Sequence, residues 1–380
     1  MASEQEASLT DAQKQIGNVI VGIVTTGKLK LVYHVEDSSL GLLPENFGIL
    51  LSPPNTAFTL FGKAYVSYIY GTPMECMGTE ISAKFPGPQA VFSPTTHAPL
   101  AFHQRTCLST DIADNDNDVP NSFDFSGLAT VLKSVFDSVT PSFAYLSELV
   151  VDVYNAMGPN CSVLLFRSFV SRVSDSMQNV KRFENLFALT HKEHIQKSIS
   201  QRLGFSVTMG DAASFHSSAE MSNLAERFMS NASADSPDDA KKSMRLLLAG
   251  PKSAGKSSLL RFLINRFVTQ STNRQIPPRI AVLDCDIGQP EFTPCGMVSL
   301  TIVTEPILGP PFTHHLKKSP NPICQCFVGA ITPSENPNFY LKCLDYVYQA
   351  YLNLPTPRPP LIVNTMGWTQ GKLNFFLTEN

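Results

Sequence analysis

The sequence has no long hydrophobic run and no secretory leader pattern. No basic segment followed by a long apolar segment opens the chain, and no apolar run approaches the roughly 20 residues that a membrane-spanning helix needs. These absences predict a soluble, intracellular protein without membrane contacts.

Cysteine is present, but not in a metal-binding or disulfide pattern. None of the eight cysteines forms a CxxC pair, and Cys324 and Cys326 are separated by only one residue. That separation is too short for ordinary zinc-finger spacing, and no second pair follows. We expect reduced cysteines that serve mainly in packing.

A strong excess of charge is also missing. The net charge is -3 and the sequence pI is about 6.2, so any contact with nucleic acid must come from a local patch. One such patch is visible, because residues 241–283 include nine lysines and arginines and no acidic residue.

The length of 380 residues is sufficient for two domains. Residues 1–16 are polar and predict a flexible tail. Short apolar runs separated by Gly, Pro and Asn predict a β-rich N-terminal domain over residues 17–210, a small sandwich or barrel with some helix near 126–155. The acidic run 111–118 predicts a solvated loop. Residues 211–240, rich in Ser, Ala and Asp, predict a linker, or an exposed helix, before a final domain at 241–380.

The final domain begins with the pattern of a phosphate-binding loop. An apolar run precedes GPKSAGKS, Gly250 to Ser257, and Leu260, Leu263, Ile264 and Phe267 follow at helical spacing. Strand, GxxxxGK[ST] and helix in this order predict an α/β P-loop NTPase core with a parallel sheet. The loop itself indicates only that a nucleoside triphosphate binds.

The chemistry of phosphate binding explains the residue types in this loop. Gly250 and Gly255 allow backbone conformations in which successive N–H groups point at phosphate oxygens. The positive end of the following helix adds to the attraction. Lys256 can reach the β and γ phosphates, and the Ser257 hydroxyl suits a magnesium ligand position.

A second acidic element follows the next predicted strand, Ile280 to Leu283. Asp284 and Asp286 come directly after this strand, where a P-loop protein holds magnesium. One carboxylate can organise the metal while the other accepts the proton of an attacking hydroxyl. Gly288 and Gln289 then permit close backbone approach and offer a side-chain amide.

Longer strings around these motifs resemble a known family. They are GPKSAGKSS, LDCDIGQPEFTPCGMVSLTIVTEPILGPPFTH, FVGAITPSENPNFY and PLIVNTMGW, which together cover about a third of the chain from Arg245 to Trp368. They resemble the polynucleotide 5'-hydroxyl-kinase family, which includes the nucleolar kinase of pre-ribosomal RNA processing and the kinase subunit of the mRNA 3'-end cleavage factor. CDIGQPEFTP and TEPILGPPFTH are most similar to the nucleolar branch.

The resemblance implies a function and a set of site residues. The family transfers the γ-phosphoryl group of ATP to the 5'-OH of RNA or DNA, with magnesium, and the nucleolar branch acts in rRNA-processing complexes of the nucleus and nucleolus. Lys256 and Asp286 are the implied catalytic residues, and Ser257, Asp284 and Asp286 the implied magnesium ligands. The residues implied in ATP binding are Gly250, Pro251, Lys252, Ser253, Ala254, Gly255, Lys256, Ser257 and Ser258. Those implied at the RNA end are Gln289, Thr332, Pro333 and Asn336.

The match to the family ends at Trp368, where the family continues with a glycine-rich turn and a long helix. This chain has TQGKLNFFLTEN instead, with no family pattern after Gly371. We expect the lid arginines and the C-terminal domain to be missing, and therefore ATP binding with weak phosphoryl transfer. The opening residues are not basic, unlike the extension of the long family members, so nucleolar targeting is implied by the family alone.

Three alternatives remain open from the sequence. A regulatory GTPase would need an NKxD string, which the sequence lacks, and DCDIG does not have DxxG spacing. An ATP-binding scaffold subunit of an RNA-processing complex would fit a chain without a lid. A small-molecule kinase or general P-loop ATPase has the same loop. Labelling of 5'-OH RNA distinguishes a kinase from a scaffold.

Overall fold

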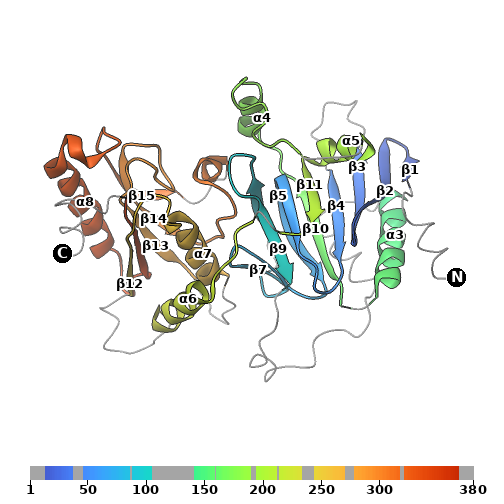
Figure 1. The fold of residues 1–380 in the computed structure, drawn as a ribbon, viewed down its shortest axis with the longest axis horizontal. Coiled ribbons are helices and arrows are strands. Elements are labelled where there is room, and N and C mark those ends of the chain that lie inside the picture. The colour runs from blue at the N-terminus through green and yellow to red at the C-terminus, as the bar shows by residue number, and fades with distance from the viewer. Residues whose placement is uncertain are drawn as a thin grey trace. The chain divides into compact units, whose positions relative to one another are not determined.

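The computed structural model of the chain describes residues 13–36, 46–85, 88–104, 141–158, 160–189, 194–211, 214–232, 244–269, 278–316 and 321–367. The expected acidic loop at 111–118, the first half of the helical segment predicted at 126–155, and residues 368–380 lie outside these ranges. The chain divides into two compact units: Met1–Cys76 with Glu80–Phe215, and Met77–Thr79 with His216–Asn380 (Figure 1).

The first unit is built on an extended β-sheet, which confirms the predicted β-rich N-terminal region. The strands lie in the order β1-β2-β3-β4-β10-β5-β9-β6-β7, and β8 and β11 also pair with the long strand β5. Their bounds are β1 Gln13–Ile16, β2 Val19–Thr26, β3 Leu29–Glu36, β4 Phe47–Ser52, β5 Phe58–Tyr70, β6 Met74–Cys76, β7 Thr79–Ile81, β8 Gln89–Ser93, β9 Leu100–Gln104, β10 Ser162–Ser168 and β11 Phe205–Met209. Residues 13–16, expected in a flexible tail, are therefore a strand paired with β2.

Helix α3, Pro141–Met157, covers part of this sheet (Figure 1). Its apolar side chains pack with those of β2, β3, β4 and β10 in one core cluster, with Leu146 and Val150 fully buried. His34 on β3 lies in the same region, 3% exposed, and stacks on the rings of Phe47 and Phe143. The unit also contains α4, Arg172–Gln178, and α5, His194–Leu203.

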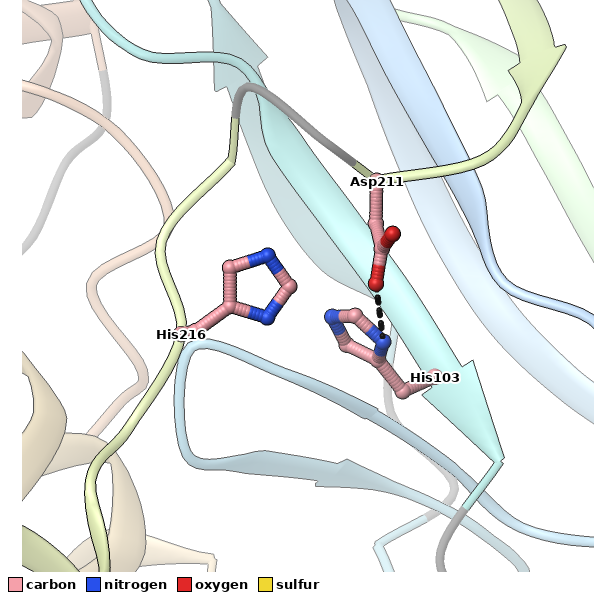
Figure 2. A group of neighbouring side chains, drawn as sticks. All are labelled: His103, Asp211 and His216. Carbon is pink, nitrogen blue, oxygen red and sulfur yellow. Dashed lines mark ion pairs between the residues drawn. The ribbon is translucent and has the colours of Figure 1, made fainter.

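An ion pair connects the ends of two strands of the first unit. His103 on β9 lies with its Nδ1 3.2 Å from Oδ2 of Asp211, which follows β11 (Figure 2). Both strands pair with β5, so the contact joins neighbouring parts of the same sheet. Each side chain is 33% exposed, and such a partly exposed pair contributes little to stability.

The second unit has a five-stranded sheet in the order β12-β16-β13-β14-β15. The strands are β12 Arg245–Leu248, β13 Ile280–Asp284, β14 Met297–Val303, β15 Pro322–Phe327 and β16 Leu361–Asn364. β12, β16 and β13 are parallel, as predicted for a P-loop core, whereas β14 and β15 continue the sheet antiparallel. Local sequence patterns did not distinguish these two directions.

Helices α7, Lys256–Val268, and α8, Pro337–Leu352, lie on opposite sides of this sheet (Figure 1). Leu260, Leu263, Ile264 and Phe267 on α7 are all buried, which confirms the predicted apolar face. On the other side, α8 packs in one core cluster with β13, β14 and β16. Two short 3-10 helices, η3 Pro311–Leu316 and η4 Pro333–Glu335, follow β14 and β15.

The expected linker at 211–240 contains a helix, α6, Ala219–Ala232. Phe228 on α6 is 1% exposed and meets Phe267 of α7 in an edge-to-face contact with ring centroids 6.0 Å apart. The segment has few large apolar residues, so its sequence did not predict this contact. Within the described ranges, no helix has the length and apolar character to cross a membrane. The described cysteines are free thiols: Cys76, Cys161, Cys285, Cys295, Cys324, Cys326 and Cys343.

Candidate active site

Three parallel strands of the second unit end side by side, and the two predicted motifs begin at these ends. Leu248 at the end of β12 and Asp284 at the end of β13 both pair in register with Asn364 at the end of β16. The phosphate loop and the acidic loop therefore leave strands that are separated by a single strand, about 9–10 Å apart. The carboxyl edge of an open α/β sheet is where such folds bind their ligands.

The phosphate loop has the backbone that its glycines predict. Gly250 and Gly255 have φ angles of 156° and 84°, and Gly255 is the N-cap of α7. Ser253 also lies in the left-handed region, at 65°, where a side chain is uncommon and costs strain. Pro251, Lys252 and the residues to Gly255 are exposed, so the loop is open to a ligand, although the N–H of Ala254 donates to the carbonyl of Pro251 at 3.3 Å.

Lys256 lies across this loop in the conformation described. Its Nζ donates hydrogen bonds to the backbone carbonyls of Gly250 at 3.0 Å and Pro251 at 2.9 Å. Ser257 is exposed on the first turn of α7, and Ser258 is half-buried beside it. The ammonium group and the hydroxyl are thus both at the mouth of the loop, where the sequence predicts phosphate and metal.

Asp284 is fully buried and shapes the acidic loop. Its Oδ1 accepts hydrogen bonds from the N–H of Asp286 at 3.2 Å and the side-chain amide of Asn364 at 3.0 Å, and its Oδ2 accepts the N–H of Glu291 at 2.5 Å. Burial raises the pKa of Asp284 to about 7, against the lowering effect of these hydrogen bonds. Both of its oxygens are therefore committed to the protein.

Asp286 is placed differently from Asp284. It is half-buried, and its Oδ1 accepts the backbone N–H groups of Gly288 at 3.1 Å and Gln289 at 2.9 Å. Among the described residues, no hydrogen bond is made to Oδ2, so one oxygen of this carboxylate remains available to a ligand. The two bonds fix the carboxylate plane, and the side chain of Gln289 is exposed next to it.

The residues implied at the RNA end lie close to the acidic loop, but two of them have structural roles. Thr332 caps η4 by accepting the N–H of Ser334, and Asn336 caps α8 by accepting the N–H of Phe339 at 3.1 Å. Pro333 is buried between them. An ideal Cβ at Gly288 would lie 3.0 Å from the carbonyl oxygen of Ile331, so this segment packs directly on the acidic loop.

Asn364 and Thr365 lie in the PLIVNTMGW string, but the sequence alone predicted no role for them. The Thr365 hydroxyl donates to the carbonyl of Leu248 at 2.8 Å, while Asn364 bonds Asp284 on the other side. Two successive residues at the end of β16 thus hold both flanking loops. The only local signal was that Asn364 and Thr365 are polar residues at the end of a predicted strand. Their position between the two loops depends on the strand order, which the local sequence does not give.

Gly367 is a second residue that the sequence did not single out. An ideal Cβ at this position would lie 2.7 Å from the backbone nitrogen of Lys252 and 2.8 Å from its Cα. The turn after β16 therefore passes in direct contact with the phosphate loop. Only a residue without a side chain fits this approach without displacing the loop.

The sequence also missed a buried charged cluster beneath the acidic loop. Glu291 bonds Arg261 of α7 through both oxygens, at 2.7 and 3.0 Å, and lies 2.7 Å from Nε2 of His314. Burial of Glu291 favours its neutral form, but Arg261 and His314 outweigh burial and lower its pKa to about 2. Glu291 is thus a buried, ionised carboxylate.

The donor set at this edge of the sheet fits a magnesium ion. Ser257 offers an exposed hydroxyl and Asp286 an available carboxylate oxygen, and hard oxygen ligands are what magnesium prefers. Asp284 offers no uncommitted oxygen. The arrangement provides backbone donors for phosphate, an ammonium group, metal ligands and a carboxylate that can accept a proton.

Comparison with known proteins finds similarity to the family that the motifs resemble. Residues 250–377 match the family model described as the mRNA cleavage and polyadenylation factor CLP1 P-loop. The polynucleotide 5'-hydroxyl-kinase GRC3 of Gibberella zeae is 42% identical over 133 residues, which are 34% of this chain and 18% of that protein. The polynucleotide 5'-hydroxyl-kinase NOL9 of Danio rerio is 27% identical over 332 residues, 86% of this chain and 42% of that protein.

A solved structure of Clp1p with Pcf11p aligns with a TM-score of 0.45 and 15% sequence identity, and covers 87% of this chain and 57% of that one. The chain spans less than half the length of either curated relative. Both relatives have the name of a polynucleotide 5'-hydroxyl-kinase.

Proposed function

We propose, from the chain's similarity to polynucleotide 5'-hydroxyl-kinases, that it transfers the γ-phosphoryl group of ATP to the 5'-hydroxyl of RNA. One observation supports this function best. The phosphate loop and the acidic loop follow β12 and β13, which lie on either side of β16. At the end of β16, Asn364 donates to Asp284 and the next residue, Thr365, donates to the carbonyl of Leu248. A triphosphate on the loop can therefore extend its γ-phosphate toward the carboxylate.

The reaction requires little covalent chemistry from the protein. The RNA O5' attacks the γ-phosphorus, the bond from that phosphorus to the bridging oxygen of ADP breaks, and the hydroxyl proton passes to Asp286. Lys256 would leave the carbonyls of Gly250 and Pro251 for the more strongly attracting phosphate oxygens. Catalysis then depends on in-line positioning and on neutralising charge on the phosphoryl oxygens.

Magnesium would be held by Ser257 and Asp286, and when bound it would neutralise charge on the phosphate oxygens. Asp284, implied as a third ligand by the family resemblance, is better suited to shaping the loop, because both of its oxygens accept hydrogen bonds from the protein. The residues Gly250 to Ser258 would bind ATP, and their backbone N–H groups, which Pro251 lacks, would donate to the phosphates.

The RNA end would approach along the segment that packs on Gly288. Gln289 is exposed beside Asp286 and can donate its amide to the acceptor nucleotide. For Thr332, Pro333 and Asn336, the cap geometry favours a role in holding the shape of this segment, with the RNA contacting its exposed surface. We include protein partners of an rRNA-processing complex and a nuclear, nucleolar location in the proposal, since the resemblance of the sequence to the nucleolar branch implies them.

The experiment is phosphate transfer from γ-labelled ATP to an RNA oligonucleotide with a 5'-hydroxyl. A matched oligonucleotide that already has a 5'-phosphate is the control acceptor. Labelling of the first only, lost in Asp286→Asn, supports the proposal. Labelling of neither by a chain that binds ATP would reject RNA 5'-phosphorylation as its activity.

A further inference from the structure

Three charged side chains from distant parts of the second unit meet under the acidic loop. Arg261 lies on α7, Glu291 follows the acidic loop, and His314 lies in η3. Their exposed side-chain fractions are 11%, 2% and 4%, and all the contacts of Glu291 with its two partners are between 2.7 and 3.0 Å. The two family-like strings CDIGQPEFTP and TEPILGPPFTH are joined physically by Glu291 and His314.

Burial makes this cluster dependent on its pairing. An ionised carboxylate out of water is costly unless it is paired and fully hydrogen-bonded. Both oxygens of Glu291 are occupied, by the guanidinium fork of Arg261 and by the imidazole of His314. A shift of α7 relative to η3 would leave one of these groups buried and unpaired, so the cluster resists relative motion of the two elements.

A backbone hydrogen bond extends this resistance to the acidic loop. The N–H of Glu291 donates to Oδ2 of Asp284, whose Oδ1 accepts the N–H of Asp286. The carboxylate of Asp284 thus holds both the beginning of the acidic loop, at Asp286, and its end, at Glu291. The position of Asp286 is determined by where Glu291 is held.

A second set of hydrogen bonds connects α7 to the segment before η3, one turn further along the helix. Asn265, fully buried and four residues after Arg261, accepts the N–H of Ile307 at 2.6 Å and donates to its carbonyl at 3.1 Å. Residues four apart lie on the same helix face. α7 therefore presents two polar anchors to the segment that ends in His314. The same helix has Lys256 and Ser257 at its first turn, so its placement sets where these two groups lie.

We infer that Arg261, Glu291 and His314 form a positioning cluster that fixes the distance between Ser257 on α7 and Asp286 in the acidic loop. These two residues are the proposed magnesium ligands, so the inference rests on the proposed function. None of the three touches substrate or metal. Their effect is to keep two ligands from different elements at the separation that one ion requires, as outer-shell partners do in metal sites.

The test uses the 380-residue chain and compares ATP affinity with and without Mg²⁺. The variant Arg261→Met/Glu291→Leu/His314→Phe replaces the cluster by apolar side chains, and such replacements commonly preserve stability. Arg358→Met is the control, because this arginine is half-buried and bonded to the carbonyl of Leu352 near the opposite end of β16. Thermal unfolding establishes that each variant is folded.

We expect the triple variant to bind metal-free ATP within about twofold of the wild type and to lose roughly 10- to 100-fold in Mg²⁺ affinity. The control should keep the full Mg²⁺ effect. A folded triple variant with an unchanged Mg²⁺ effect would overturn the inference and leave the proposed function intact. A wild-type chain that binds no ATP would overturn both. If the triple variant does not fold, the near-isosteric Glu291→Gln replaces it, and a full Mg²⁺ effect in that variant would equally overturn the inference.

Discussion

The side-chain amide of Asn364 donates a hydrogen bond of 3.0 Å to Oδ1 of Asp284, directly across the pairing of β16 and β13. Both residues end their strands and both are buried. On the other side of β16, Thr365 bonds the carbonyl of Leu248, where the phosphate loop begins. The last residues of one strand thus set the separation of the two loops that would contact the phosphates and the acceptor hydroxyl.

Asp284→Ala should destabilise the second unit strongly, because it leaves the N–H groups of Asp286 and Glu291 and the amide of Asn364 without their acceptor. Each buried unsatisfied group costs about 1–3 kcal/mol. Asp284→Asn keeps the shape and one acceptor oxygen, so it should be milder by at least about 1 kcal/mol. Chemical denaturation of the two variants measures the difference, and equal destabilisation would contradict the assigned hydrogen bonds.

Lys256→Ala should abolish the stabilisation of the chain by ATP. In the wild type, ATP at about 100 times its Kd should stabilise the folded state by about 2.7 kcal/mol. The measurement is thermal unfolding with and without the nucleotide. Lys342→Ala, which removes an exposed lysine from α8, is the matched control and should retain the full ATP effect. GTP in place of ATP tests the nucleotide preference in the same assay.

Gly367→Ala should weaken ATP binding without removing any group that contacts the nucleotide. The new Cβ would lie 2.7 Å from the backbone nitrogen of Lys252, so the phosphate loop must shift. A displacement of this size should reduce ATP affinity by roughly tenfold or more, since each 1.4 kcal/mol of strain or lost contact is tenfold. Calorimetric titration with ATP measures the effect. Unchanged affinity would show that the loop can move without cost.

His34 should make the first unit sensitive to acid. Burial lowers the pKa of His34 to about 4 from its ordinary 6.5, so the folded state binds a proton less readily than the unfolded chain. This stability is fully present above pH 6.5 and is lost as the pH falls through 4. The loss amounts to about 3 kcal/mol.

The measurement for His34 is the stability of the first unit against pH in the wild type and in His34→Phe. Phenylalanine can keep the stacking on Phe47 and Phe143 but does not titrate, although it loses the contact of His34 with Ser142 at 3.2 Å. The variant should show a flatter profile between pH 6.5 and 4. Parallel profiles would refute the titration of His34 as the cause.

The sequence predicted the parts of the site that are local in the chain. Gly250 to Ser257 and the strand ending at Asp284 are continuous segments whose residue types follow from their chemistry. Asn364 and Thr365 could not be assigned, because their partners are Leu248 and Asp284, 117 and 80 residues away. The contact is made by the strand order, which local patterns do not encode.

The buried charged cluster was hidden for a related reason. Arg261 lies in an amphipathic helix, where an arginine is normally expected on the solvent-exposed face. Its burial becomes evident only once Glu291 and η3 are placed beside the helix. The same holds for Phe228. It lies on helix α6 and packs against Phe267, in a segment whose composition favours a linker or an exposed helix. In the sheet, β14 pairs antiparallel with β13, and β15 pairs antiparallel with β14, so these directions are set by pairing across the sheet.

The most direct test of the account is the transfer of labelled phosphate from ATP to a 5'-hydroxyl RNA oligonucleotide, measured on the 380-residue chain beside Asp286→Asn. The asparagine keeps the hydrogen bonds to Gly288 and Gln289 through one oxygen but cannot accept the hydroxyl proton. We predict weak but measurable labelling by the wild type and at least a hundredfold slower labelling by the variant, in line with the loss of a general base, at unchanged affinity for metal-free ATP. Equal rates in the two proteins, or no labelling by a wild type that binds ATP, would contradict the account.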